Sequence, residues 1–325
     1  MFFNLIIKKF FNLIIKKIRN FFPKKHRGLN KYKLKKYQVY PEGKYLNKSL
    51  EEYGDYILNK LNLNKNNKIV CIGTCFAEEI ANFLHKNNQN YKIHETNIFK
   101  FSVNWGRVYT STNLRQILDY SLNPKFKIYF KERPDGFYDP LRDYTCGAFQ
   151  SKEDLIKNIR RHRALSKKIL SSCDQIFITL GQTDYWFEKK NNLIWGTIPS
   201  KEKDFSNNIG IKYKIKSETI NDITNNINYV INKLNKINNK IKIIFTLSPV
   251  PSSATFFNEN VILKSFENKA KLKIAISNII KKNINVYYFP SFESVILDNH
   301  NFLSDNRHVK SKKVSKILKV FKKYI

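Results

Sequence analysis

Acidic residues are scarce in this sequence. There are 26 Asp and Glu against 59 Lys and Arg, which gives a formal net charge of +33. Such an excess of cations is typical of proteins that bind nucleic acid, anionic lipid or acidic substrates. The lysines are nevertheless dispersed along the chain among many Asn and Ile residues, and are not gathered beside stacking aromatic residues as single-strand binders require. A composition bias of the whole sequence is the simpler explanation, and the pattern argues against a nucleic-acid partner.

Cysteine is also rare, with four residues in a chain of 325. Cys71, Cys75, Cys146 and Cys173 are too few and too scattered for a disulfide framework, so we expect reduced thiols and a cytoplasmic location. Cys71 and Cys75 form a C-x3-C pair without a second cluster, which argues against zinc. We therefore predict no metal site, and we place Cys71 in the core.

Apolar runs of membrane-spanning length are absent, although 42% hydrophobic residues are ample for a packed core. In residues 1–22 the motif FFNLIIKK occurs twice, and its lysine pairs argue against both a spanning helix and a cleavable signal peptide. This segment fits a basic amphipathic helix on an anionic membrane surface, which would place the protein peripherally on the inner face of the membrane. A duplicated leader that packs on the body or stays disordered is an equal alternative.

The remaining chain divides into a connector and one α/β domain. Residues 23–65 are basic and then polar, with a short helix expected from about Leu50 to Leu61, and residues 66–325 form the domain. Buried strands are predicted at 68–73, 175–181, 241–248 and 284–289, and helices before the last three at 151–171, 217–238 and 260–281. This alternation predicts a mainly parallel sheet with helices on both faces.

Residues with reactive or polar side chains gather just after these strands. The segments are GTC (73–75), GQTDYW (181–186), SPVPSSAT (248–255) and PSFES (290–294). Because ligands bind at the carboxyl ends of parallel strands, these segments are expected to line a pocket. After the last strand, Asp305 and His308 precede a final amphipathic helix.

A family resemblance follows from five blocks: IGTCFAEEI, ITLGQTDYW, LSPVPSSAT, YFPSFE and SDNRHV. Their order and spacing resemble the GSCFA-domain family over roughly residues 66–323, and that family looks like a branch of the SGNH/GDSL hydrolases. The resemblance implies a three-layer, flavodoxin-like sheet and an esterase or acyltransferase. A short acyl group on a carbohydrate or glycoconjugate is the expected substrate. No cofactor is implied, except an acyl donor such as acyl-CoA in a transferase.

The resemblance also implies catalytic roles. The superfamily nucleophile lies two places after the glycine of the first block, which is Cys75 after Gly73, whereas the GSCFA family usually has Ser where this chain has Thr74. The methyl group of Thr74 would crowd a hydroxyl nucleophile, which favours Cys75, and Thr74 is equally well explained as a helix N-cap. We expect the helix N-terminus to lower the pKa of the Cys75 thiol.

His308 would accept the proton of the nucleophile, and Asp305 would orient its ring. The backbone N–H groups of Cys75 and of the Gly181 turn would bind the oxyanion. The superfamily often has Asn shortly after this glycine, and Gln182 is a longer replacement. The further predicted oxyanion or substrate-binding residues are Gly73, Gln182, Thr183 and Asp184.

Two alternatives remain open from the sequence. Cys75 could be a buried small residue, and the chain a catalytically inactive binding or scaffold protein attached to membrane through residues 1–22. Arg107, Asp139 and Arg142 could bind an anionic group, although a solvated ion pair is the commoner outcome for such residues.

Overall fold

The computed structural model describes residues 38–41, 45–88, 90–142, 146–195, 197–199, 202, 205–297 and 301–324. The amphipathic helix proposed for residues 1–22 lies outside these ranges. The chain divides into two units, Met1–Glu52 and Tyr53–Ile325, and the division falls within helix α2 (Tyr45–Lys60). Within the described ranges, the helices are too short or too polar to cross a membrane.

Four parallel strands form the central sheet of the larger unit. They are β1 (Ile69–Gly73), β4 (Gln175–Leu180), β8 (Lys242–Leu247) and β9 (Val286–Phe289), paired in that order. All four predicted strands are therefore confirmed. Every residue of β1 and β4 is buried, as the nearly continuous apolar runs indicated.

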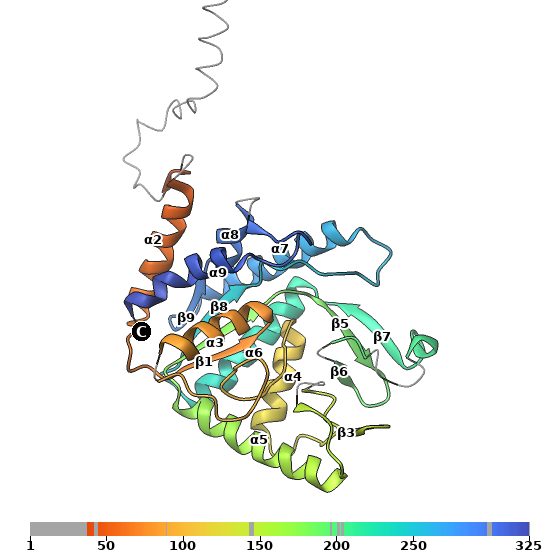
Figure 1. The fold of residues 1–325 in the computed structure, drawn as a ribbon. Helices are drawn as coiled ribbons and strands as arrows, with labels where there is room; N and C mark the ends of the chain where they lie inside the picture. The colour runs from red at the N-terminus through yellow and green to blue at the C-terminus, as the bar shows by residue number, and fades with distance from the viewer. Residues whose placement is uncertain are drawn as a thin grey trace, which may run out of the picture. The chain divides into compact units, whose positions relative to one another are not determined.

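Helices cover both faces of this sheet, which confirms the three-layer α/β class. Val70 and Ile72 of β1 join the hydrophobic cluster that includes α4 to α7, whereas Ile69 and Cys71 join the cluster of α3 and α9 on the other face (Figure 1). The helices are α3 (Cys75–Asn87), α4 (Ser111–Leu122), α5 (Lys152–Ser172), α6 (Ile220–Ile237), α7 (Val261–Ile280), α8 (Ser291–Ile296) and α9 (Ser311–Leu318).

Two antiparallel elements were not predicted from the sequence. The first is a hairpin of β2 (Lys131–Arg133) and β3 (Gly136–Tyr138). The second is a sheet of β5 (Asp184–Glu188), β6 (Leu193–Trp195) and β7 (Tyr213–Ser217) in the order β6-β5-β7, and it begins directly after β4 (Figure 1). The segment GQTDYW, expected to be an irregular tail, thus contains the start of a strand. Short 3-10 helices occur at Ser206–Asn208 and Lys319–Lys323.

Gly73 makes the turn from β1 into α3 possible. Its φ angle is +142°, and an added Cβ atom would lie 2.2 Å from the Thr179 carbonyl oxygen of β4. Its own carbonyl accepts the Val108 N–H at 2.9 Å, and the next N–H, of Thr74, donates to Thr179 at 3.1 Å. Only glycine fits between these backbones. The turn consequently holds residues 74 and 75 against the carboxyl end of β4.

We predict that Gly73→Ala destabilises the protein far more than Gly210→Ala, measured by urea unfolding. Gly210 also has a positive φ, +83°, but nothing lies within 4 Å of its added Cβ. Gly210→Ala should cost only backbone strain, about 1 kcal/mol, whereas Gly73→Ala adds a backbone clash and should cost more than about 3 kcal/mol. Equal losses in the two variants would contradict the close approach of β1 and β4.

Candidate active site

Thr74 is the N-cap of α3. Its side chain is 1% exposed, and its hydroxyl oxygen accepts the Phe76 N–H at 3.3 Å. The capping interpretation of Thr74 is therefore confirmed. A buried hydroxyl that already accepts this hydrogen bond is a poor nucleophile, which leaves Cys75 as the candidate.

Cys75 is the first residue of α3 and is half-buried. The prediction that its thiol has a lowered pKa is wrong. Burial raises the pKa above its ordinary value of 9.0, because removal of water disfavours the thiolate. The positive charges of Arg107 and Lys269, and the Cys75 backbone N–H, lower the pKa only in part. The thiol is consequently protonated at rest and needs a base before it can attack.

Lys269 of α7, which the sequence analysis did not single out, is one of the two positive charges that act on this thiol. Its side chain is 4% exposed, and its Nζ atom donates hydrogen bonds to the carbonyl oxygens of Gly181 at 2.5 Å and Val250 at 3.0 Å. A Cβ atom added to Gly181 would lie 3.3 Å from this Nζ and 3.2 Å from Thr74 Cγ2. Lys269 therefore occupies the carboxyl edge of the sheet beside the β1–α3 turn.

The environment of Lys269 favours the neutral amine. Burial lowers its pKa from 10.5 to about 7, and the Cys75 thiolate opposes this shift. A neutral amine has two N–H donors and one lone pair, and the two carbonyls of Gly181 and Val250 use both donors. The lone pair is then available to accept a proton, which makes Lys269 a candidate general base.

Residues 107–109, which we call the crossing segment, run across the ends of β1 and β4. Arg107 forms an ion pair with Glu78 at 2.8 Å and stacks over the Phe99 ring at 4.4 Å. The carbonyl of Tyr109 accepts the N–H groups of Gly181 at 3.0 Å and of the following residue at 3.1 Å. The prediction that the Gly181 turn supplies an oxyanion donor is therefore wrong, because its N–H is already bonded.

His308 and Asp305 form the predicted pair. His308 Nδ1 lies 2.5 Å from Asp305 Oδ2, and the Arg307 backbone N–H, followed by the His308 ring, lowers the pKa of Asp305. The His308 side chain is 54% exposed. Among the described residues, no hydrogen bond joins this ring to the Cys75 thiol. Arg107 and Lys269 are the positive charges that lower the pKa of the thiol, and the role of His308 as its base stays a prediction.

The other predicted substrate-binding residues separate into two groups. Thr183 is fully buried, and its hydroxyl donates to Asn268 Oδ1 at 2.6 Å, so its role is internal. Gln182 and Asp184 line a cavity of about 190 Å³, together with Asn113 and Trp195. We call this the polar cavity. Gly73 has the backbone role described above.

Three residues that line the polar cavity have buried polar atoms without a hydrogen-bond partner. They are Asn113 Oδ1 and Nδ2, Asp184 Oδ1 and Trp195 Nε1. Buried polar groups in proteins are normally hydrogen-bonded, and a group left without a partner costs about 1 to 3 kcal/mol. These atoms are enclosed by the protein, so the polar character of the cavity comes from lining side chains such as Gln182, Thr197 and Asp184.

A second cavity, of about 390 Å³, is lined in part by Lys269. We call it the apolar cavity. Its apolar lining comes from the start of α7, from α8 and from the loop after α8, and consists of Val261, Ile262, Phe266, Phe292, Ile296 and Phe302. Asp305 and Lys269 also line it, and Ser252 and Ser253 line both cavities.

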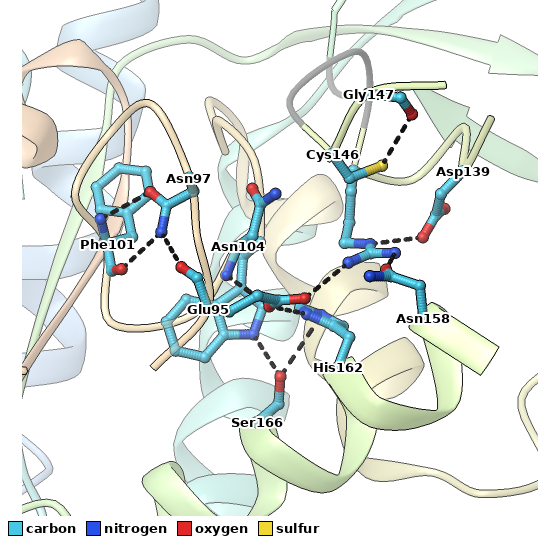
Figure 2. Close-up of polar contacts among 12 residues, drawn as sticks. Glu95, Asn97, Phe101, Asn104, Asp139, Cys146, Gly147, Asn158, His162 and Ser166 are labelled. Carbon is cyan, nitrogen blue, oxygen red and sulfur yellow. Dashed lines mark hydrogen bonds and ion pairs between the residues drawn. The ribbon is translucent and has the colours of Figure 1, made fainter. Parts of the chain in front are cut away.

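A buried charged network supports the crossing segment (Figure 2). Glu95 accepts hydrogen bonds from the Asn104 N–H at 2.9 Å and from Arg142 at 3.2 Å, and His162 lies at 2.7 Å. Arg142 also donates to Asp139 at 2.6 Å, and both side chains are almost completely buried. The expectation of a solvated pair is wrong for these residues. Because the network fixes Asn104, it helps to hold the segment that follows.

The chain belongs to the GSCFA family, whose family model matches residues 68–321. The match confirms the resemblance drawn from the five sequence blocks and spans the sheet together with both cavities. No curated protein matches the chain. In the described ranges, no group of three His, Cys, Asp or Glu side chains could hold a metal ion.

One sequence signal could have identified Lys269. The predicted helix 260–281 has buried apolar residues at Leu272, Ile276 and Ile279, and Lys269 lies on the same helical face, three residues before Leu272. A lysine on an apolar stripe is seldom buried unless it has a partner or a function. Lys269 was missed because it lies within a helix, whereas functional residues were expected only after the strands.

Alkylation by iodoacetamide should report the charges around Cys75. We expect Arg107→Gln to raise the pKa of the thiol further, because a stabilising positive charge is removed, and Glu78→Gln to lower it. The rate is followed against pH by mass spectrometry of the modified peptide. Cys146, whose pKa burial raises to about 11, is an internal control that should not respond to either change. Unchanged profiles in both variants would show that these charges do not reach the sulfur.

Proposed function

We propose that the protein is an acyl-transfer enzyme acting on ester bonds, with Cys75 as the nucleophile and Lys269 as its general base. The observation that carries the proposal is the buried Lys269 amine, which two carbonyls hold at the carboxyl edge of the sheet and whose charge acts on the Cys75 thiol. Lysine replaces histidine as the base in some nucleophile–base pairs of other hydrolases. The GSCFA membership supports the fold of this site, and the chemistry is our inference.

The proposed reaction conserves protons at each step. The Lys269 lone pair takes the proton of the Cys75 thiol, and the thiolate attacks the ester carbonyl while the Cys75 N–H donates to the oxyanion. The C–O bond then breaks, the alcohol leaves with the proton from Lys269, and a thioester on Cys75 remains. Water or a second alcohol attacks the thioester and gives its proton to Lys269. The C–S bond then breaks, the acid or new ester leaves, and the Cys75 sulfur takes the proton back from Lys269. Hydrolysis and transfer differ only in that acceptor, and a transferase would take its acyl group from a donor such as acyl-CoA.

The alcohol part of the substrate is proposed to be a carbohydrate or glycoconjugate in the polar cavity. Sugars present many hydroxyl groups and apolar ring faces, and the lining side chains of Gln182 and Asp184 together with the Trp195 indole ring match both. The four cysteines are free, so we keep a reducing, cytoplasmic location as part of the proposal.

Ester hydrolysis tests the proposal directly. With p-nitrophenyl acetate, we expect Cys75→Ala to be inactive and Lys269→Met to lose roughly a hundredfold to ten-thousandfold in kcat. Lys269→Arg should be equally poor, because arginine keeps the charge but does not release a proton near neutral pH. Wild-type kcat/KM should rise with pH and level off above about 7, where the amine becomes neutral.

Lys264→Met is the matched control, since Lys264 is a buried lysine of the same helix that pairs with Glu259 and Glu267. It should keep its activity. His308→Ala is included because the role of His308 stays a prediction. If His308→Ala is inactive while Lys269→Met is active, the base is assigned to the wrong residue. Absence of activity and of a trapped acyl group in every form would favour the binding or scaffold alternative.

Stability against pH gives an independent test of the Lys269 environment. The pKa is lower in the folded protein, about 7, than the ordinary 10.5, so the unfolded chain binds more protons between these values. Wild-type stability relative to Lys269→Met should therefore rise between about pH 7 and pH 10, by up to about 1.4 kcal/mol per pH unit, and be flat below about pH 6. Urea unfolding at several pH values measures the difference. A constant difference would mean that the lysine is protonated throughout.

A further inference from the structure

The apolar cavity lies beside Lys269 and has a lining unlike that of the polar cavity. Its walls come from α7, α8 and the loop after α8, and they present mainly aliphatic and aromatic side chains. With about 390 Å³ it has twice the volume of the polar cavity, at about 190 Å³. A space of this size and character favours a hydrocarbon group over the short acyl group expected from the sequence.

The polar side chains of the apolar cavity are mostly bonded to the protein. The Ser265 hydroxyl accepts the Ser252 N–H at 2.9 Å, and Asp305 is paired with His308. Arg307 donates from Nη2 to the Pro251 carbonyl at 3.3 Å, but its Nε atom is buried without a partner. The Arg307 guanidinium lines the cavity and is only partly buried. It can bind one oxygen at the end of an otherwise apolar ligand.

We propose that the apolar cavity binds the hydrocarbon chain of a fatty acyl group, with its carbonyl or carboxylate end toward Lys269 and Arg307. This inference rests on the proposed function, because that function makes the acyl carbonyl the reacting group. Burial of the chain explains why the rim is apolar, and the positive charge of Arg307 explains how an acyl oxygen is oriented. The substrate class is then a fatty acyl ester, or a fatty acyl donor in a transferase.

Exposed residues of α7 at the rim of the cavity allow a test variant and a matched control variant. Ile262 and Phe266 line the cavity and are 63% and 55% exposed, so aspartate at these positions should not prevent folding. Leu263 is 71% exposed in the same first turn of α7 and does not line the cavity. Ile262→Asp/Phe266→Asp is therefore the test variant, and Leu263→Asp is its control for added charge and lost apolar surface.

Two measurements test the assignment on the full-length protein. The first is kcat/KM for p-nitrophenyl esters from acetate to decanoate, which should rise by up to about fourfold per added methylene while the chain is being buried. The second is binding of dansyl-undecanoic acid to the Cys75→Ala protein, which does not depend on turnover. In both, the double aspartate variant should lose the chain-length preference and bind at least about tenfold more weakly, and Leu263→Asp should match the wild type.

The outcomes separate the two proposals. Binding of the fatty acid with no ester hydrolysis would keep the cavity assignment and refute the proposed function. Hydrolysis that is equal for all chain lengths, without fatty-acid binding, would keep the function and refute the cavity assignment. If the double variant and Leu263→Asp weaken fatty-acid binding equally, the ligand adsorbs to an apolar surface. This result would also overturn the cavity assignment.

Discussion

The burial of one lysine is the constraint on which the candidate site depends. Helix α7 carries Lys269 to the carboxyl ends of the strands, where the carbonyls of Gly181 and Val250 accept its hydrogen bonds. An exposed lysine would be protonated at neutral pH and could not accept a proton. The same loss of water raises the pKa of the Cys75 thiol. At a pH above about 7 both groups are therefore mainly uncharged, and in the proposed reaction charge would separate only when a carbonyl accepts the attack.

The backbone around this pair is held by contacts that leave little room for change. Gly73 lets β1 approach the carbonyl of Thr179, and the crossing segment bonds to both β1 and the Gly181 turn. Behind the crossing segment, Glu95 and Arg142 form a buried network, which is costly to break because a lone buried charge would remain. Main-chain contacts and distant ion pairs thus position the Cys75 and Lys269 side chains. These two side chains themselves make few hydrogen bonds.

The sequence predicted the central sheet because its signals are local. Buried strands read as continuous apolar runs, and the helices between them have a regular period, so their existence needed no tertiary information. The antiparallel strands β5 to β7 have only three to five residues each, too few to show a clear period, and they were missed. The pKa of Cys75 was predicted with the wrong sign, since a helix N-terminus is visible in sequence but burial is not. Lys269 was missed because its partners, at Gly181 and Val250, are distant in the chain.

One loop lines both cavities, and in the proposed reaction each cavity would take one end of an ester. Ser252 and Ser253 lie in the connection from β8 to α7 and line both spaces, and the Ser252 N–H is fixed to Ser265 of α7. An ester has an acyl side and an alcohol side that diverge from the carbonyl carbon. Under the two proposals, the acyl side would lie along the apolar walls and the alcohol side among the polar side chains of the other cavity. Changes in this single loop would then alter acyl and alcohol selectivity together.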